Sequence, residues 1–431
     1  MKNSEKTRDI WYQLDNAANL FPSISGNSNT NVFRLTCALR EPVDPGRLQA
    51  ALEAAIDSFP YFEVVMRRGL FWFYLERTNL RPVAEPESGR PCGRIFYKHI
   101  KELLFRVTYF QNNINLEVFH AISDGTGAFD FLRAILYSYL VSAHRDSLPE
   151  ELPILDREPP PVQQAEDSFN RYYTPDKTKS PFKQRAFTIG GTLLPNQSIR
   201  IITATLPTSQ MLALAKSKGV TITAYLTSLM ILSVYQELMP KRAIERTVSV
   251  TVPVDLRGHF TSETSRNFFS VMDIGYNFSK GSDSFEEILA HVTRKLQEKT
   301  NPQVLARAFG YTMSVQKNPF SRFTPLVLKN HILKAAYVKR ERATTCALSN
   351  LGRITMPEPF VPYIDHFSCL LNPTHLHRWK ACICSFEDAL VISFTSCIAE
   401  TRAHKAFIRH LSAQGLDICV TCNGGADDEI L

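Results

Sequence analysis

The sequence lacks the long apolar segments that export or membrane insertion requires. Residues Met1 to Trp11 are charged and polar and contain no apolar core of a signal peptide. The longest uncharged apolar stretch, Val220 to Tyr235, includes Thr and Ser and falls short of the roughly 20 residues of a spanning helix. We therefore expect a buried helix at this stretch, no stable membrane insertion and a cytoplasmic protein.

The cysteines do not form the pattern of a disulfide framework. There are nine of them, an odd number, and no secretory signal accompanies them, so reduced thiols are expected. A zinc site is a weak alternative, because the paired C-x-x-C knuckles of structural zinc sites are missing. The residues that would have to supply it are Cys382, Cys384, Cys419, Cys422, His375 and His377. We expect no metal.

Charge of one sign is only mildly in excess. The formal net charge is +7, and we take it as spread along the chain, whereas nucleic-acid binders concentrate basic residues on one face. No nucleic-acid partner is therefore expected. The charge fits either an anionic small ligand or a slightly basic solvated surface. One basic cluster could meet phosphates or form a solvated helix face: Lys329, Lys334, Lys339, Arg340 and Arg342.

The length and patterning predict a mixed α/β protein in two parts. With 431 residues, 44% of them hydrophobic, the chain is long enough for two domains. No short repeat is present. A proline-rich and charged stretch from Asp146 to Pro195 includes three consecutive prolines at 159–161, which exclude a helix interior or a central strand. We take it as a crossover and predict domains at residues 1–190 and 191–431.

Periodicity predicts the main elements on each side of this crossover. Alternation and turn signals predict strands at residues 33–40, 61–66, 70–75, 103–110, 114–119, 199–206, 248–252, 382–385 and 390–397. Three pairs of these strands are expected to form hairpins: 61–66 with 70–75, 103–110 with 114–119, and 382–385 with 390–397. Helical spacing predicts helices at residues 45–59, 129–140, 210–218, 223–238 and 285–296, and a final amphipathic helix that carries residues 407–411. Asp44 is the expected N-cap of the first helix, and Ser284 with Glu287 the expected capping box of the fifth.

His120 is the strongest candidate for chemistry. It follows the strand pattern at residues 114–119 and begins the segment His-Ala-Ile-Ser-Asp-Gly, which includes Asp124 and Gly125. Histidine titrates near neutral pH and can accept and return a proton, and a strand end holds a side chain rigidly at the edge of a cleft. Gly125 removes a side chain where substrate must pass. A structural histidine in a strand-to-helix turn is the alternative that this short pattern leaves open.

Three segments together resemble the superfamily of chloramphenicol acetyltransferase, BAHD enzymes, condensation domains and alcohol acetyltransferases. They are His120–Gly125, Pro253–Arg257 with Arg266–Phe268, and Ser349–Gly352. They occur in the family order, and the resemblance extends over residues 11–420 and is strongest to alcohol acetyltransferases. Two features depart from it: Phe119 replaces the first histidine of many relatives, and the D-F-G-W-G motif of BAHD enzymes is absent.

The resemblance implies a fold and a chemistry. The fold would be a pseudo-dimer of two α/β subdomains, mixed-sheet two-layer sandwiches with a tunnel at their interface. His120 would be the general base that moves an acyl group from acyl-CoA, a co-substrate rather than a bound cofactor, to an alcohol hydroxyl without an acyl-enzyme. Asp124 would pair with Arg257 to hold the histidine loop. Ser349 or Asn350 would stabilise the oxyanion, unless they only form a turn.

Other functions remain open from the sequence. An amide-forming, condensation-like transferase could use an amine acceptor and an acyl carrier protein acting in trans. A non-catalytic binding relative could retain the fold without the activity, although His120 and Asp124 are intact. A membrane-surface enzyme is not expected, because no lipidation motif or strongly basic amphipathic helix is evident.

Overall fold

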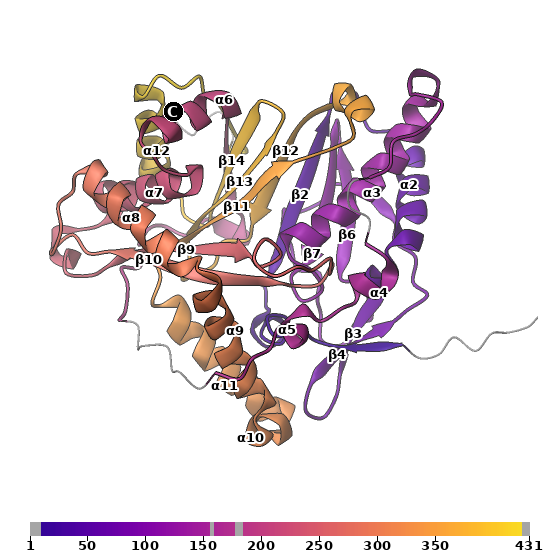
Figure 1. Cartoon of the computed structure of the whole chain (residues 1–431), viewed down its shortest axis with the longest axis horizontal. Helices are drawn as coiled ribbons and strands as arrows, with labels where there is room; N and C mark the ends of the chain where they lie inside the picture. Colours follow the sequence, from indigo (N-terminus) through magenta and orange to yellow (C-terminus); the bar gives the residue numbers. More distant parts are fainter. Residues whose placement is uncertain (1–9, 156–158, 177–183, 425–431) are drawn as a thin grey trace, which may run out of the picture.

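The computed structural model describes residues 10–155, 159–176 and 184–424. Most of the polar N-terminal segment and parts of the predicted crossover therefore lie outside the described residues. Figure 1 shows two sheets side by side in the centre of the molecule, with helices on the outer side of each. The predicted α/β class with mixed sheets is confirmed.

The first sheet has the strand order β12-β2-β7-β6-β5. His120 directly follows the last residue of its strand β7. Its bounds are Ile364–Leu371 for β12, Val32–Leu39 for β2, Asn113–Phe119 for β7, Phe105–Phe110 for β6 and Ala84–Pro86 for β5. Strands β5 and β6 are parallel, and the other pairs are antiparallel. Helices α2 (Pro45–Ser58) and α3 (Gly125–His144) cover this sheet (Figure 1).

Local chemistry explains where these elements begin. The Asp44 carboxylate accepts a hydrogen bond from the backbone N–H of Arg47 at 2.9 Å, so the predicted N-cap of α2 is confirmed. A 3₁₀ turn at Pro60–Phe62 delays the strand predicted from residue 61, and β3 instead covers Val64–Arg68. Strand β3 pairs with β4 (Phe73–Arg77), and β4 pairs with β1 (Trp11–Gln13), which makes a separate small sheet.

The second sheet has seven strands in the order β10-β9-β11-β13-β14-β8-β15. Strand β11 is parallel to both its neighbours, and the other pairs are antiparallel. The bounds are Phe269–Tyr276 (β10), Val248–Asp255 (β9), Cys346–Ile354 (β11), Trp379–Phe386 (β13), Ala389–Ser396 (β14), Arg200–Pro207 (β8) and Cys419–Cys422 (β15).

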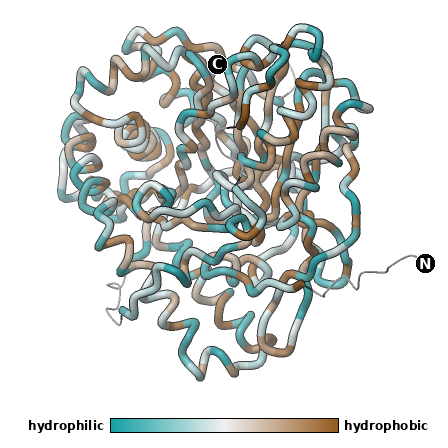
Figure 2. The backbone as a smooth tube through the Cα atoms, turned by 45° about the vertical axis from the view of Figure 1, so that its right-hand side comes forward, coloured by the Kyte–Doolittle hydropathy of each residue, from teal (hydrophilic) through white to brown (hydrophobic). Residues whose placement is uncertain are grey.

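The helices that cover the second sheet are α6 (Thr208–Ser217), α7 (Ile222–Leu238), α8 (Phe285–Lys299) and α12 (Arg402–Ala413). Helix α7 is buried along most of its length, as predicted. Among the described residues no single helix is long and apolar enough to cross a membrane, and one sharply bent pair, α6 with α7, passes only by length and composition. Hydrophobic positions gather along the central strands, whereas hydrophilic ones lie outside (Figure 2).

The predicted capping box of α8 is wrong in its bonds. Ser284 is the N-cap residue, but its hydroxyl donates to Glu286 and makes no cap hydrogen bond. Glu287 instead accepts from the backbone N–H of Ser282 and from the hydroxyl of Tyr276. The start of the helix was nevertheless predicted correctly, because Ser284 is the N-cap residue. The Glu287 carboxylate simply takes its hydrogen bonds from Ser282 and Tyr276 and not from Ser284.

Smaller helices surround the two sheets. Helices α1 (Phe21–Ile24), α4 (Pro161–Gln164) and α5 (Ser168–Arg171) are each about one turn long. Helices α9 (Pro302–Lys317), α10 (Pro319–Phe323) and α11 (Leu326–Glu341) extend from the body, and α10 is at their far end (Figure 1).

Strand β12 crosses from the C-terminal half of the chain into the first sheet. It pairs with β2 over most of its length, so the first sheet is built from both halves. The domain boundary between residues 190 and 191 stays a prediction. In the fold, the two halves of the chain are joined by the pairing of β12 with β2 as well as by the segment that links them in sequence.

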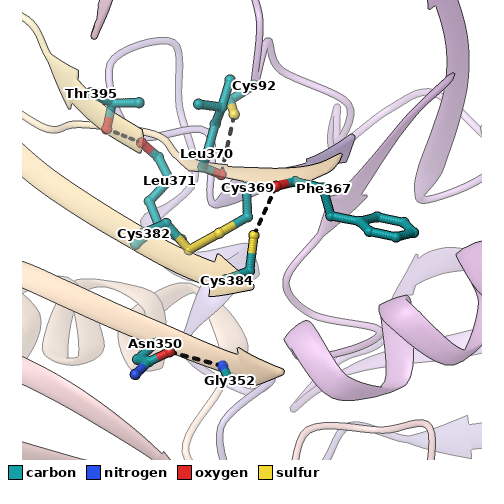
Figure 3. The surroundings of a disulfide bond; sticks show 10 residues. All are labelled: Cys92, Asn350, Gly352, Phe367, Cys369, Leu370, Leu371, Cys382, Cys384 and Thr395. Atoms are coloured by element: carbon teal, nitrogen blue, oxygen red, sulfur yellow. Dashed lines mark hydrogen bonds between the residues drawn. A yellow bond between two sulfur atoms is a disulfide. The ribbon is translucent and has the colours of Figure 1, made fainter. Parts of the chain in front are cut away.

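A disulfide also joins the two sheets, and it corrects the expectation that all the thiols are reduced. Cys369 of β12 is bonded to Cys382 of β13, with their Cα atoms 5.8 Å apart, within the ordinary range for a disulfide (Figure 3). The pairing was missed because the 13-residue separation in sequence gives no sign that the two strands are neighbours across the sheets. The other seven cysteines are free.

Candidate active site

His120 lies where β7 ends and the turn into α3 begins. Its backbone N–H donates to the carbonyl of Asn31 at 2.8 Å, which fixes the chain at this point. Three phenylalanine rings surround the imidazole: Phe21 stacks on it at 4.8 Å, Phe33 meets it edge-on at 5.0 Å, and Phe269 lies at 5.3 Å between ring centres. The ring is therefore held in one orientation by packing from both halves of the chain.

Asn267 holds one nitrogen of this ring. The Oδ1 atom of Asn267 lies 3.0 Å from Nδ1 of His120, and Nδ2 of Asn267 donates to the carboxylate of Asp15 at 3.3 Å. Because the amide N–H group is engaged by Asp15, its oxygen is left to accept, so Nδ1 of His120 carries the proton. The other nitrogen, Nε2, then keeps its lone pair, as a general base requires.

Asp15 was missed in the sequence, and Asn267 was noted only as part of a motif. Asp15 is buried and also accepts from the backbone N–H of Ala18 at 2.8 Å. Burial raises the pKa of Asp15 to about 6, against the opposing charge of Arg266. No local pattern in the sequence could pair Asp15 with Asn267, because they are 252 positions apart.

Burial also determines how His120 titrates. It lowers the pKa of His120 below its ordinary value of 6.5, and the nearby Asp124 carboxylate and the Asn267 hydrogen bond only partly oppose this. The imidazole is consequently neutral at physiological pH.

Asp124 and Arg257 form the predicted ion pair. Two guanidinium nitrogens of Arg257 donate to the two carboxylate oxygens of Asp124 at 2.8 and 3.1 Å, and both side chains are buried. Asp124 also accepts from the backbone N–H groups of Gly127 and Phe268 at 3.0 and 2.8 Å. Burial alone would raise the pKa of Asp124, but Arg257 and these donors outweigh it and hold the pKa below its usual value.

The same pair joins the two motifs. Arg257 further donates to the backbone carbonyls of Thr264 and Arg266, at 2.9 and 2.7 Å, which precede Asn267. The ion pair thus fixes the loop that presents Asn267 to His120 as well as the start of α3. The hydrogen bonds of Asp124 go to these structural partners, as expected for a positioning residue.

The glycines after Asp124 allow close approach. A Cβ atom at Gly125 would lie 2.5 Å from a methyl carbon of Leu351, so Gly125 brings the histidine loop against the third motif. A Cβ at Gly127 would lie 2.2 Å from the backbone carbonyl oxygen of Ser265. A backbone atom cannot move aside as a leucine methyl group can, so the need for glycine is stricter at position 127 than at position 125. The sequence did not reveal this difference.

Ser349 and Asn350 lie inside strand β11, but the pairing of β11 with β13 shifts register between Asn350 and Arg353, and Gly352 has a positive φ of 77°. The strand is therefore interrupted by a local turn directly after this pair. The Asn350 amide donates to the hydroxyl of Thr223 at 3.0 Å, and its oxygen accepts from the backbone N–H of Gly352 at 2.8 Å (Figure 3). Among the described residues, no hydrogen bond joins either side chain to His120. One amide hydrogen of Asn350 remains for another acceptor.

Three of the six candidate zinc ligands are engaged in other contacts. Cys382 is in the disulfide, the thiol of Cys384 donates to the carbonyl of Phe367 at 3.2 Å, and His377 contacts Glu341 and Thr344. Within the described part of the chain, no group of three or more His, Cys, Asp or Glu is arranged to hold a metal ion.

Comparison with known proteins finds likeness in structure and not in sequence. No protein-family model matches the chain, and no curated protein matches it. The TRI101 protein of F. graminearum, in complex with coenzyme A and T-2 mycotoxin, superposes with a TM-score of 0.61 at 11% identity, covering 94% of this chain and 97% of that one.

Two further solved structures broaden the comparison. The TRI3 trichothecene 15-O-acetyltransferase of Fusarium sporotrichioides has a TM-score of 0.62 at 11% identity and covers 94% and 95% of the two chains. The starter condensation domain of rhizomide synthetase has a TM-score of 0.56 at 13% identity and covers 94% and 96%. This chain therefore has the fold shared by CoA-dependent acyltransferases and condensation domains, as its three motifs predicted.

Proposed function

We propose that this protein is an acyltransferase that moves an acyl group from acyl-CoA to the hydroxyl of an alcohol, with His120 as general base. The observation that carries the proposal is the hydrogen bond from Nδ1 of His120 to Asn267, which leaves Nε2 unprotonated. The likeness to a trichothecene 15-O-acetyltransferase and to TRI101 in complex with coenzyme A supports the choice of donor. Acyl-CoA acts as a co-substrate, and no bound cofactor is required.

The reaction needs one base and no covalent intermediate on the protein. Nε2 of His120 removes the proton from the acceptor hydroxyl, and the oxygen attacks the thioester carbonyl carbon. The tetrahedral intermediate then collapses with cleavage of the C–S bond. The departing thiolate takes the proton from the imidazolium, which regenerates neutral His120 and releases free thiol and ester.

Other residues have supporting roles in this proposal. Asp124 and Arg257 position the histidine loop, and Gly125 lets this loop pack closely against Leu351. The remaining amide hydrogen of Asn350, or the hydroxyl of Ser349, donates to the oxyanion. The subdomains at residues 1–190 and 191–431 form a pseudo-dimer, and both substrates reach His120 through a tunnel between them.

An amide-forming reaction with an acyl carrier protein as donor is the second candidate, because a condensation domain has the same fold. Thiol release from acyl-CoAs of increasing chain length, measured with alcohols or amines as acceptors, separates the two. We expect alcohol-dependent release with the wild type and its loss in His120→Ala. The exposed His99 provides the matched control, His99→Ala.

Either of two results would contradict the proposal. Equal release by wild type and His120→Ala would remove His120 from the chemistry. Folded wild type that releases no thiol from any acyl-CoA, with any acceptor, would favour a carrier-protein donor or a non-catalytic binding role.

A further inference from the structure

The positive charge of this protein is concentrated in one segment, which corrects the expectation that it is spread along the chain. Residues 301–340 contain seven Lys and Arg and no Asp or Glu, whereas the whole chain has a formal net charge of +7. The remainder of the chain is therefore formally neutral. This segment comprises α9, α10 and nearly all of α11, the helices that extend from the body (Figure 1).

The same helices expose large apolar side chains at their far end. Phe320 is 88% exposed and Phe323 is 67% exposed, both on α10. The docking patch, as we name it, consists of these two and four neighbours: Leu70, Val327, Leu328 and Ile332. Exposed hydrophobic residues that occur singly need no explanation, but a contiguous group on a projecting element indicates an interaction site.

Contacts show that the docking patch is continuous across two parts of the chain. The backbone N–H of Leu326 donates to the carbonyl of Leu70 at 2.9 Å, and the Phe71 and Phe323 rings meet edge-on at 6.2 Å. The ammonium of Lys329 donates to the carbonyl of Phe71 at 2.9 Å. The turn between β3 and β4 is thus fixed against the start of α11, and the patch is a built surface.

Basic groups adjoin the apolar ones along the same helix. The outer face of α11 passes from Val327, Leu328 and Ile332 to a basic pocket of about 580 Å³. None of the described residues that line this pocket is acidic; they are Arg185, His331, Lys334, Ala335, Val338, Lys339, Arg342 and Ala343. Such a surface is electrostatically complementary to a layer of phosphate groups.

We propose that the docking patch and the basic face of α11 bind the surface of an anionic lipid membrane. Phenylalanine rings on a convex tip insert at the boundary between headgroups and acyl chains, while neighbouring Lys and Arg contact the anionic headgroups. The absence of acidic residues from 301–340 favours a phosphate-bearing surface over a protein partner with charges of both signs. A membrane-surface enzyme was not expected from the sequence because no lipidation motif or strongly basic amphipathic helix was evident, whereas the fold brings exposed apolar side chains of α10 and exposed basic side chains of α11 onto one projecting part of the molecule.

This surface lies close to the candidate active site. The inner side of α11 packs on α1 and on the chain that follows it, where Ser23 donates to Asn330 at 2.7 Å and Asn29 donates to Tyr337 at 3.2 Å. Helix α1 in turn carries Phe21, which stacks on His120. Docking would therefore place a lipid-borne substrate on the Phe21 side of His120. The membrane proposal itself does not depend on acyl transfer.

Vesicle flotation with the full chain tests the proposal. Vesicles of phosphatidylcholine alone are compared with vesicles in which about a third of the lipid is phosphatidylglycerol. We expect co-flotation only with the anionic vesicles, and its loss at high salt. Phe320→Ser with Phe323→Ser should weaken binding about tenfold or more, because two inserted rings are lost. Arg322→Gln with Lys334→Gln should weaken it roughly fivefold per charge.

Matched controls use equally exposed residues elsewhere. Val162→Ser removes an apolar side chain that is 85% exposed, and Lys241→Gln with Arg242→Gln removes two exposed charges outside the patch. Both should float like the wild type. No co-flotation of the wild type, or flotation unchanged in both patch variants, would overturn the proposal. A dimer in solution that dissociates in the phenylalanine variant, without vesicle binding, would overturn it in favour of a second copy.

Discussion

Replacement of Asn267 by leucine tests whether the orientation of His120 depends on this amide. Leucine has nearly the same volume but cannot accept a hydrogen bond, so the Nδ1–H group of His120 loses its partner. The Nε2–H tautomer, which cannot act as a base, then becomes populated. Loss of one partner in a buried hydrogen bond costs about 1–3 kcal/mol, which corresponds to roughly a 5- to 150-fold decrease in kcat.

Two measurements together separate this effect from general damage. Steady-state kinetics should show the decrease in kcat with little change in KM, because Asn267 does not contact the substrates in the proposed reaction. The ¹⁵N NMR signals of the His120 imidazole should show a protonated Nδ1 in the wild type and a mixture of tautomers in Asn267→Leu. The second readout would not move if Asn267 only supported the fold.

Asn267→Asp is the matched variant, because it keeps an acceptor next to His120. We expect the wild-type tautomer to persist in it. The added negative charge should raise the pKa of His120 and move the acidic limb of the pH profile upward. A folded Asn267→Leu enzyme with wild-type kcat and an unchanged NMR spectrum would refute the assignment of Nε2 as a base oriented by Asn267.

The site supports three further predictions. The acidic limb of the kcat/KM profile should have its midpoint below pH 6.5, because the base must be neutral and burial lowers the pKa of His120; a midpoint above 6.5 would contradict this. Gly127→Ala should lower the free energy of unfolding by about 1–3 kcal/mol in denaturant titrations, since its Cβ meets backbone, whereas Gly258→Ala, with open space around it, should not. Asp124→Asn should lower it by about 3 kcal/mol, because buried Arg257 loses its main charged partner, and a stability equal to wild type would count against the ion pair.

The elements and the local motifs could be predicted from the sequence because their causes are local. Alternation defined β2, β7 and β13, helical spacing defined α2 and α7, and Asp44 capped its helix as expected. The pairing of Asp124 with Arg257 was available only through the resemblance of two motifs to a known family. Neither residue has a local feature that indicates the other.

The features that were missed depend on chain segments far apart in sequence. Asp15 reaches Asn267 across 252 residues, and Cys369 meets Cys382 only because β12 leaves its own half to join the first sheet. The concentration of basic charge was present in the sequence. The role of this charge could not be predicted, because only the fold shows that α10 and α11 project from the body beside Leu70.

The strand crossover and the disulfide bear directly on the chemistry. His120 comes from the first half of the chain and Asn267 from the second, so a hydrogen bond of 3.0 Å between them requires the two halves to stay in register. Strand β12 ties the halves through its backbone pairing with β2, the Cys369–Cys382 bond fixes β12 to β13 of the second sheet, and the Asp124–Arg257 pair ties the halves at the site itself. The orientation of the base therefore depends on these links, since His120 and the Asn267 amide that faces its Nδ1 come from different halves of the chain.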